Sequence, residues 1–442
     1  MVCFLVLKNR KMTSQHKREN LMFNLRQKLW SSLLIISIFT AYGCATFKPG
    51  PIDETIFRNR GQSKTDGVVK VTATILSREE TREIFGLDLY KESIQPIWLE
   101  IKNNDDKRVW VPPFGVDPDY FAPFEVAYMH HFFFSKRTNA KMDRYFHEKT
   151  MDSYVPPGNI RSGFIFTNLD LGTKGFNVDL VGENHEIRTF TFFIPVPGFK
   201  VSHQDVDWHK LYSKDEIVSY DDMESFRTAL EELPCCSTNQ QSNKEGNPLN
   251  LVIIGSGKAL HQALIRSGWD ETESLNKDSV SMTATTAAFM KKDRYASMKP
   301  FYLYGRPQDA AFRKIRQMAD ERIHLRLWLS PMRFSGEPVW VGQISRDIKV
   351  RFLPDTYQIE PLVDEARTYM LQDIWYVQGL MKFAHVKGVG AASIYEPRKT
   401  FNNDSYFTDG YRLVLWVSSR PVSFSDAENL KWEQLIKGTK DN

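Results

Sequence analysis

The feature that most constrains the fold is the alternation of apolar and polar residues between positions 68 and 194. Runs such as Val69–Ile75 and Ile97–Asn103 place an apolar side chain at every second position, and turn residues separate them. A period of two is typical of strands that bury one face. The spacing of these short strands predicts an immunoglobulin-like β-sandwich over residues 67–200.

One part of this segment has a helical period instead. Aromatic residues recur three or four positions apart, at Phe121, Phe124, Tyr128 and Phe132. This spacing is typical of an amphipathic helix, so we predict a helical hairpin insert at about residues 119–150. Its apolar stripe is expected to pack on the sandwich, and the alternative is an aromatic surface that faces a membrane or a partner.

A polar segment bounded by prolines separates this part of the chain from one with a different rhythm. We interpret residues 201–247 as a connector and linker, with the linker itself at 234–248. After it, apolar strands at 249–254, 323–329, 339–345, 349–353 and 412–417 are mixed with helices at about 256–267, 310–320 and 361–380. This mixture predicts an α/β or α+β domain with a mixed sheet over residues 248–436.

The N-terminus has the layout of an export signal. The first 43 residues hold seven Lys or Arg and one Glu, so residues 44–442 carry a slight negative charge although the whole chain has a net charge of +4. A basic stretch is followed by the 14-residue apolar run Leu29–Tyr42 and by Gly43 before Cys44. This order predicts a signal segment over residues 1–43.

The residues Ala41-Tyr42-Gly43-Cys44 resemble a bacterial lipobox. The resemblance implies that Cys44 is lipidated and becomes the new N-terminus, with residues 44–66 as a tether. An uncleaved anchor helix and plain secretion are the alternatives. We therefore expect a lipid-anchored protein of the bacterial cell envelope, at the outer membrane and facing the periplasm, with the membrane as a partner and an envelope protein or lipid as a further candidate partner.

Several classes of function lack support in the sequence. The excess positive charge lies in the signal segment, so nucleic-acid binding through a basic surface is not expected. Outside that segment and Cys44, the cysteines are the adjacent pair Cys235 and Cys236, and no Cys or His spacing matches a zinc motif. We expect no cofactor and no metal.

Six motifs in residues 249–380 resemble, in order, those of the LssY C-terminal domain family. They are Leu249–Ser256, Ser267–Trp269, Tyr302–Asp309, His324–Trp328, Val339–Gly342 and Ile359–Asp364. The resemblance implies an origin in the bacterial envelope, because the family's domain occurs in lipoproteins and behind integral-membrane modules. It implies no particular reaction, and it does not cover the predicted sandwich.

The best candidate site lies on a predicted hairpin. The odd positions of residues 323–329 are apolar, so His324 and Arg326 share the other face of that strand. Ser335-Gly336 predicts the turn into the next strand. We predict a register in which paired residue numbers sum to 671, so that His324 lies opposite Asp347 and Arg326 opposite Ser345.

This face carries the candidate catalytic residues His324, Asp347 and Ser345. A His/Asp pair can act in acid–base catalysis, and Ser345 is a possible nucleophile only if it lies beside His324 rather than across from Arg326. The alternative is a solvated strand face with a cross-strand ion pair.

The loop from Gly305 to Asp309 is a second candidate. Arg306, together with Arg326, could bind an anion, whereas Asp309 could belong to the same site or merely cap the helix expected at 310–320. Because every catalytic motif is incomplete, a binding or scaffolding role at the membrane surface is the expected function. The alternative is a hydrolase or phosphoryl-handling enzyme that uses the His/Asp/Arg strand face.

Overall fold

The computed structural model describes residues 46–274, 294–315, 322–349 and 357–433. The chain divides into two compact units, and each is considered by itself. The first contains the described residues up to Pro49 together with 123–148, and the second contains the rest. Cys44 and the predicted signal segment lie outside the described residues. Within those residues, no helix is both long enough and apolar enough to cross a membrane.

The first unit is built on a pair of helices, within the range in which the sequence predicts a helical hairpin. They are α4 (Pro123–Met129) and α5 (Lys136–Lys149). The Asn139 side chain closes the turn, because it accepts from the backbone N–H of Phe132 and donates to its carbonyl. Phe47 is buried against α5, with its ring 5.5 Å from Tyr145 and 6.5 Å from Phe146. The N-terminal segment is therefore packed on the insert within this unit.

Apolar side chains of the same unit are also left in solvent. Phe133 and Phe134, between the two helices, are 87% and 86% exposed, and Tyr128 at the end of α4 is 64% exposed. The expectation that the stripe packs on the sandwich stays a prediction.

The second unit begins with two antiparallel sheets that share one hydrophobic core. One sheet has the order β1 (Gln62–Thr65), β2 (Val69–Ile75), β3 (Ile94–Asn103), β6 (Ile160–Asn168), and the other β5 (Tyr154–Val155), β4 (Val109–Trp110), β7 (Thr173–Gly182), β8 (Ile187–Pro195). Alternate residues such as Val71, Leu99 and Val178 point into the core, as the period of two requires. Two short helices accompany the sheets, α2 (Glu54–Arg60) and α3 (Arg78–Phe85). The immunoglobulin-like part of the prediction is not settled by this arrangement.

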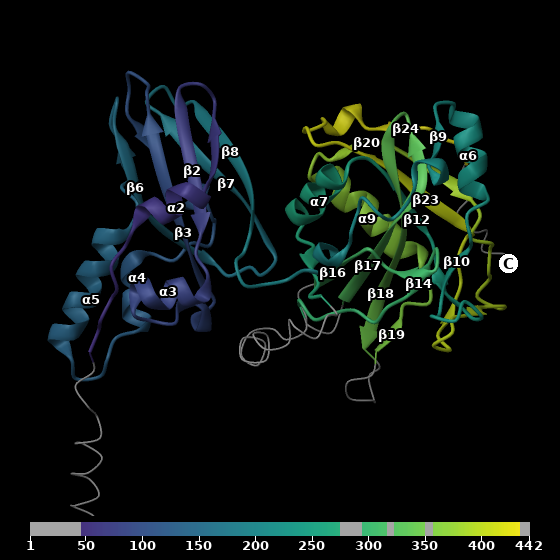
Figure 1. The fold of residues 1–442 in the computed structure, drawn as a ribbon, viewed down its shortest axis with the longest axis horizontal. Helices are drawn as coiled ribbons and strands as arrows, with labels where there is room; N and C mark the ends of the chain where they lie inside the picture. Colours follow the sequence, from purple (N-terminus) through teal and green to yellow (C-terminus); the bar gives the residue numbers. More distant parts are fainter. Residues whose placement is uncertain (1–45, 275–293, 316–321, 350–356, 434–442) are drawn as a thin grey trace, which may run out of the picture. The chain divides into compact units, whose positions relative to one another are not determined.

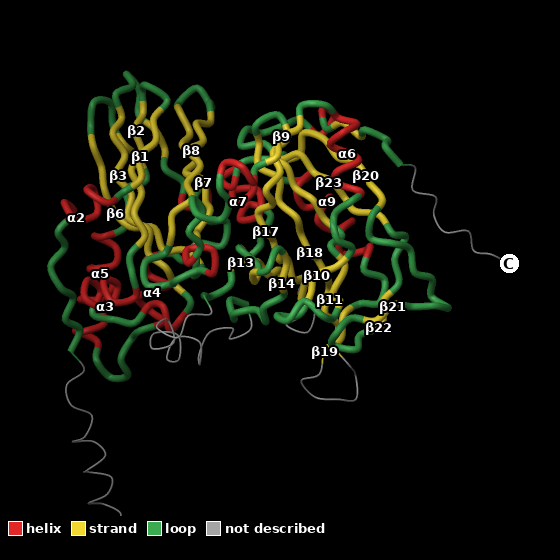
Figure 2. The backbone as a smooth tube through the Cα atoms, turned by 45° about the vertical axis from the view of Figure 1, so that its right-hand side comes forward, coloured by secondary structure: helices red, strands yellow, loops and turns green. Residues whose placement is uncertain are grey.

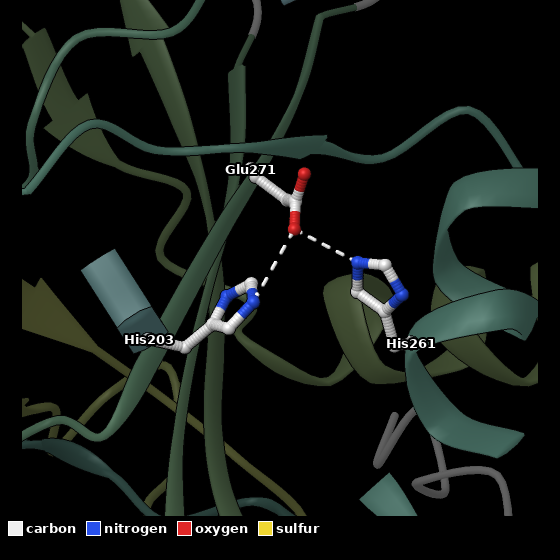
Figure 3. A group of neighbouring side chains, drawn as sticks. All are labelled: His203, His261 and Glu271. Atoms are coloured by element: carbon white, nitrogen blue, oxygen red, sulfur yellow. Dashed lines mark hydrogen bonds and ion pairs between the residues drawn. The ribbon is translucent and has the colours of Figure 1, made fainter. Parts of the chain in front are cut away.

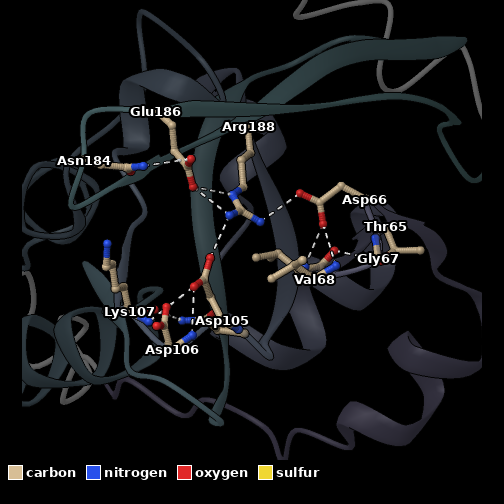
Figure 4. A network of polar contacts seen from close by, with 12 residues as sticks. Thr65, Asp66, Gly67, Val68, Asp105, Asp106, Lys107, Asn184, Glu186 and Arg188 are labelled. Carbon is tan, nitrogen blue, oxygen red and sulfur yellow. Dashed lines mark hydrogen bonds and ion pairs between the residues drawn. The ribbon is translucent and has the colours of Figure 1, made fainter.

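An arginine ties the loops of the two sheets together at one end (Figure 4). The Arg188 guanidinium lies 3.0 Å from Asp66 in the β1–β2 turn and 2.7 Å from Asp105 after β3. It also pairs with Glu186 at 2.6 Å. Since the Arg188 side chain is only 18% exposed, this network links turns from both sheets more firmly than a fully solvated ion pair would.

The rest of the second unit is built around a large mixed sheet, as expected (Figures 1 and 2). Its order is β13 (Asp270–Glu271), β16 (Ala310–Ile315), β17 (Arg322–Phe334), β18 (Glu337–Lys349), β12 (Leu251–Ile254), β23 (Tyr411–Val417), β20 (Leu380–Lys387), β24 (Glu428–Asn429), with β19 (Tyr357–Ile359) beside β18 and β9 (Val218–Tyr220) beside β17. Strands β12 and β23 are parallel, whereas β17 and β18 are antiparallel.

Helices cover both faces of this sheet. Leu251 and Ile253 of β12 pack with α7 (Gly257–Arg266) and α9 (Asp364–Tyr376), while Val252 and Ile254 pack with α6 (Met223–Glu231) on the other face. The Ser256 side chain accepts from the backbone N–H of Ala259 and caps α7. The glycine-rich segment after β12 is therefore the start of a helix.

Two sequence-based expectations need correction. The helix expected at 310–320 is wrong for residues 310–315, which form strand β16, because pairing with β13 and β17 outweighs helix propensity there. Residues 234–248, expected as a linker, contain β10 (Cys236–Thr238) and β11 (Glu245–Pro248), which pair with each other. These strands form a small sheet with β14 (Tyr302–Leu303) and β15 (Arg306–Pro307). Another short pair is β21 (Arg398–Lys399) and β22 (Ser405–Tyr406).

Candidate functional site

The candidate site is built on the hairpin β17–β18, and its turn is the one expected. Phe334 pairs with Glu337, so Ser335 and Gly336 form a two-residue turn. Both have positive φ, 48° and 81°. This is the backbone of a type I′ turn, whose twist matches that of the flanking strands.

The register differs from the predicted one beyond a bulge in β17. Arg333 pairs with Pro338, which fits the predicted sum of 671, but Leu329 pairs with Trp340, which lowers the sum to 669. Pro331 lies within the irregular stretch and has no N–H for the ladder. The Ser330 hydroxyl instead donates to the carbonyl of Val339. The predicted pairing of His324 with Asp347 is therefore wrong by two residues, although the faces are kept because the shift is even.

The shifted register gives His324 different partners from those expected. Ser345 lies directly opposite His324 in the ladder, and Gln343 lies opposite Arg326. Asp347 is diagonal to His324, and its Oδ2 still lies 3.2 Å from Nδ1 of that ring. The His/Asp contact expected from the sequence is therefore present. The Nε2 of His324 is buried without a hydrogen-bond partner, so Ser345 does not bond to it.

Arg326 is buried beside this pair, with only 5% of the residue exposed. Its Nη1 donates to Gln343 Oε1 at 2.8 Å, and its guanidinium lies 4.0 Å from the centre of the Phe301 ring. These partners are neutral, so the cation gains hydrogen bonds and a cation–π contact from them but no opposite charge. The face is thus covered by the segment around Phe301 and is not the solvated strand face considered above.

These residues line a cavity of about 240 Å³. Its lining comes from β11, β16, β17, β18, β19, the segment before β14 and the loop before β22. The residues are Asn247, Ser297, Met298, Lys299, Phe301, Arg313, His324, Arg326, Ser345, Asp347, Ile359, Asn402 and Asp404. The volume is below the range typical of pockets for drug-sized molecules, so it suits a ligand of a few heavy atoms or one group of a larger molecule.

Burial sets the protonation states in the cavity. Burial, followed by the nearby arginines Arg313, Arg326 and Arg322, lowers the pKa of His324 well below its usual value. The imidazole is therefore neutral at pH 7, and an Nδ1–H directed at Asp347 leaves the lone pair on Nε2. Burial raises the pKa of Asp347 to about 6 and lowers that of Arg326 to about 10. Arg326 remains a cation at neutral pH.

The second candidate pair lies elsewhere. Arg306 and Asp309 line a different cavity, of about 430 Å³, and they bind each other through two contacts of 2.9 Å. Asp309 also accepts from the backbone N–H of Leu329 at 2.7 Å. It caps no helix, because the residues that follow form β16, so that expectation is corrected. The structure does not bring Arg306 together with Arg326 or the His/Asp pair.

The family comparison concerns the same part of the chain. Residues 227–411 match the family model described as LssY C-terminus. Over these residues the α/β domain is similar to the LssY C-terminal family. The match includes β12 and the hairpin β17–β18 and ends at the first residue of β23, and it contains every described residue that lines the 240 Å³ cavity. The prediction from the six motifs is confirmed.

A solved structure is also similar to this chain. The crystal structure of a Bacillus subtilis protein described as a "putative lipoprotein (ycdA)" matches with 12% identity and a TM-score of 0.19, over 70% of this chain and 98% of that one. No curated protein matches the chain.

Sequence reasoning missed part of the cavity of the LssY C-terminal-like domain. Arg313 was not predicted as a site residue, because residues 310–315 were expected to be helical. Strand β16 places it directly opposite His324. Lys299 and Asp404 come from irregular segments far apart in the chain. The alternation of side chains around Phe312 could have indicated that Arg313 lies on a strand, but no local pattern predicts that Lys299 and Asp404 line the cavity.

Proposed function

We propose that the protein is a bacterial envelope lipoprotein whose LssY C-terminal-like domain binds a small anionic ligand at the membrane surface. One observation carries the ligand part: a buried guanidinium, that of Arg326, and a buried imidazole nitrogen without a hydrogen-bond partner, that of His324, line the same small cavity. Buried polar groups without partners are rare in folded proteins.

The charges around the cavity favour an anion. Its lining contains three cationic side chains, Lys299, Arg313 and Arg326, and two carboxylates, Asp347 and Asp404. Burial raises the pKa of both carboxyls, which weakens their negative charge near neutral pH. A phosphate or carboxylate group would accept from Arg326 in the planar geometry that a guanidinium offers. The same chemistry is present in a phospholipid headgroup and in a free phosphate ester.

Binding is favoured over covalent catalysis because no nucleophile is activated. Ser345 lies opposite His324 but does not bond to its Nε2. A serine needs that contact, or one close to it, to lose its proton during attack. The geometry therefore supports recognition better than acyl or phosphoryl transfer to Ser345.

Thermal unfolding in the presence of two probes tests the ligand. Inorganic phosphate and sn-glycerol 3-phosphate should each raise the Tm of the full-length protein, since a ligand that binds only the folded state stabilises it. Lys299→Ala and Arg326→Gln should remove most of this shift. Lys299 is exposed, so its loss should leave the fold intact.

A matched control is available at the other cavity. Lys210 has a side chain that is 83% exposed and lines the 430 Å³ cavity, so Lys210→Ala should keep the full response. A Tm shift that is equal in Lys299→Ala, Arg326→Gln and Lys210→Ala would mean that the ions act elsewhere. A response to glycerol 3-phosphate alone would favour a lipid headgroup, and equal responses would favour free phosphate compounds.

The lipoprotein part rests on the signal layout and on the lipobox-like residues before Cys44. Metabolic labelling with a palmitate analogue should mark the wild-type protein. Cys44→Ala or globomycin should abolish the label, whereas Cys3→Ala should keep it, because Cys3 lies in the segment to be removed. A label that persists in Cys44→Ala would rule out lipidation at this position.

A second candidate function is hydrolysis by a His/Asp pair. The observation that favours it is that Asp347 lies 3.2 Å from Nδ1 of His324 while Nε2 has no partner. A neutral imidazole held in this way can take a proton from water. Turnover of p-nitrophenyl phosphate or p-nitrophenyl acetate should then be lost in His324→Ala and Asp347→Asn. Equal rates in wild type and His324→Ala would eliminate this candidate.

A further inference from the structure

Two histidines and a glutamate from three separate elements meet outside the cavity described above (Figure 3). His203 belongs to a short 3-10 helix, Ser202–Asp205, His261 lies on α7 and Glu271 ends β13. One potential metal-ligating atom from each residue lies within 4.8 Å of the other two. No local pattern predicts this group, because its first and last members lie 68 positions apart in the chain.

Both imidazoles turn the same nitrogen toward one carboxylate oxygen. The Nε2 of His261 lies 2.8 Å from Glu271 Oε1, and the Nε2 of His203 lies 3.5 Å from the same atom (Figure 3). Tetrahedral coordination at bond lengths near 2.0–2.1 Å separates neighbouring ligand atoms by about 3.3 Å. The two observed distances lie on either side of that value, so small side-chain rotations would place an ion between the three atoms.

The carboxylate is held in place by a second contact. Oε2 of Glu271 accepts from the backbone N–H of Thr173 at 2.5 Å, and this leaves Oε1 for the two imidazoles. Carboxylate ligands of metal ions are commonly fixed by such hydrogen bonds. The Glu271 side chain is 1% exposed, whereas His203 and His261 are 26% and 25% exposed. A buried anion thus lies below two imidazoles that solvent can reach.

Aromatic rings lie close to the two imidazoles. The rings of His203 and His261 are 5.6 Å apart between centroids, and the His261 ring lies 6.3 Å from that of Phe312. The Phe312 ring stacks near His203, at 6.4 Å between centroids, and supplies an apolar wall.

We propose that His203, His261 and Glu271 bind one divalent transition-metal ion, with Zn²⁺ as the expected occupant. Two imidazoles and one carboxylate are a ligand set that Zn²⁺ accepts in tetrahedral sites with one open position. The ion would replace the hydrogen bond between His261 and Glu271 by coordinate bonds from all three side chains. It would also fasten the 3-10 helix, α7 and β13 to one another.

A second group of candidate metal ligands has to be distinguished from this one by experiment. Among the described residues, Cys235, Cys236 and Glu245 also converge. The two cysteines are joined by a disulfide, so they offer no thiolate to a metal. A metal bound at that place would require reduction of the disulfide first.

Calorimetric titration of the full-length protein in detergent tests the proposal. After removal of metals with EDTA, ZnCl₂ should bind with a stoichiometry of one ion per chain, under non-reducing conditions. Titration with Co²⁺ should produce the visible absorption of a tetrahedral Co²⁺ complex. His203→Ala, His261→Ala and Glu271→Gln should each weaken Zn²⁺ binding by at least about 100-fold, the upper end of what loss of an outer-shell partner costs.

The control variant is His209→Ala, because His209 is exposed and lies six residues from His203 on the same connecting segment. It should bind Zn²⁺ as wild type does. Circular dichroism of the EDTA-treated variants checks that they are folded, and His261→Cys, which supplies a thiolate, should recover most of the affinity lost in His261→Ala. The proposal is overturned if wild type takes up no Zn²⁺, if uptake survives His261→Ala and His203→Ala, or if uptake appears only after reduction of the Cys235–Cys236 disulfide.

Discussion

His324 links the candidate site to the stability of the fold. Its side chain is 13% exposed, and burial lowers its pKa well below the usual value. In the unfolded chain a histidine titrates near 6.5, so below that pH the unfolded state binds a proton that the folded state does not. The free energy of unfolding should therefore fall on acidification below pH 6.5, by up to about 1.4 kcal/mol per pH unit from this group alone.

His324→Gln isolates this contribution, because glutamine does not titrate. The difference in unfolding free energy between wild type and His324→Gln should shift in favour of the variant as pH falls from 7 to 5. The contribution of Asp347 to the free energy of unfolding has the opposite pH dependence. Its pKa is raised to about 6, so the stability that it contributes at low pH is lost as pH rises from about 4 to 6. Because Asp347 contacts His324, the comparison is made with Asp347→Asn in both proteins, which removes that contribution. Urea unfolding at several pH values gives the curves, and parallel curves would contradict the buried, neutral state of His324.

Arg412 is the residue whose loss should damage the fold most. It is fully buried, and its guanidinium donates to backbone carbonyls from six residues: Leu230, Leu233, Pro234, Leu249, Lys387 and Gly388. Arg412→Met would leave these acceptors without a donor, at a cost of at least about 3 kcal/mol. We expect a large loss of soluble yield and of unfolding free energy. Arg420→Met, at an exposed position, is the control and should change neither.

At the level of elements, the β17–β18 turn makes a local prediction. Gly336 has φ of 81° and no atom within 4 Å of the position of a Cβ. Gly336→Ala would therefore create no clash, and its cost is the strain of a left-handed backbone, about 1 kcal/mol. Urea unfolding should show a lower midpoint with an unchanged m-value.

The control for this turn is Gly257→Ala at the start of α7. A Cβ there would meet Trp340 at 3.4 Å, an ordinary contact, and no positive φ is required. The variant should be neutral or slightly more stable, since alanine favours a helix over glycine. If both substitutions lowered stability equally, the effect at Gly336 would not come from its backbone.

The same hairpin shows what the sequence could and could not predict. Alternation fixed which residues of β17 share a face, and Ser335-Gly336 located the turn, so the approach of His324 and Asp347 was foreseeable. Pro331 indicates that the hydrogen-bond ladder is interrupted near this position, but it does not show by how many residues the register shifts. The observed cross-strand partner of His324 is therefore two residues from the predicted one: Ser345, rather than Asp347, lies directly opposite. The meeting of His203 with Glu271 depends on contacts between segments that are distant in the chain, and no local pattern predicts it.

At the scale of the whole molecule, the proposed lipid anchor would bring the exposed aromatic residues of the first unit close to the membrane. Phe47 is 3% exposed and packs on α5, and Lys141 donates to its carbonyl at 3.5 Å. Three residues of extended chain reach at most about 10 Å, so a lipid on Cys44 would hold this unit at the bilayer surface. Phe133 and Phe134, 87% and 86% exposed in the same unit, are then candidates for contact with the lipid interface, where aromatic side chains are favoured.

Photocrosslinking tests this arrangement in the lipidated, full-length protein. Phe134→p-benzoylphenylalanine, reconstituted into vesicles that contain an alkyne-labelled phospholipid, should acquire the lipid label on irradiation. Tyr395 is 91% exposed in the other unit and serves as the matched position. Tyr395→p-benzoylphenylalanine should acquire little label, because solvent exposure alone does not bring a side chain to the bilayer. Equal labelling at the two positions would indicate non-specific adsorption, and no labelling at position 134 would leave the aromatic pair available to a protein partner instead.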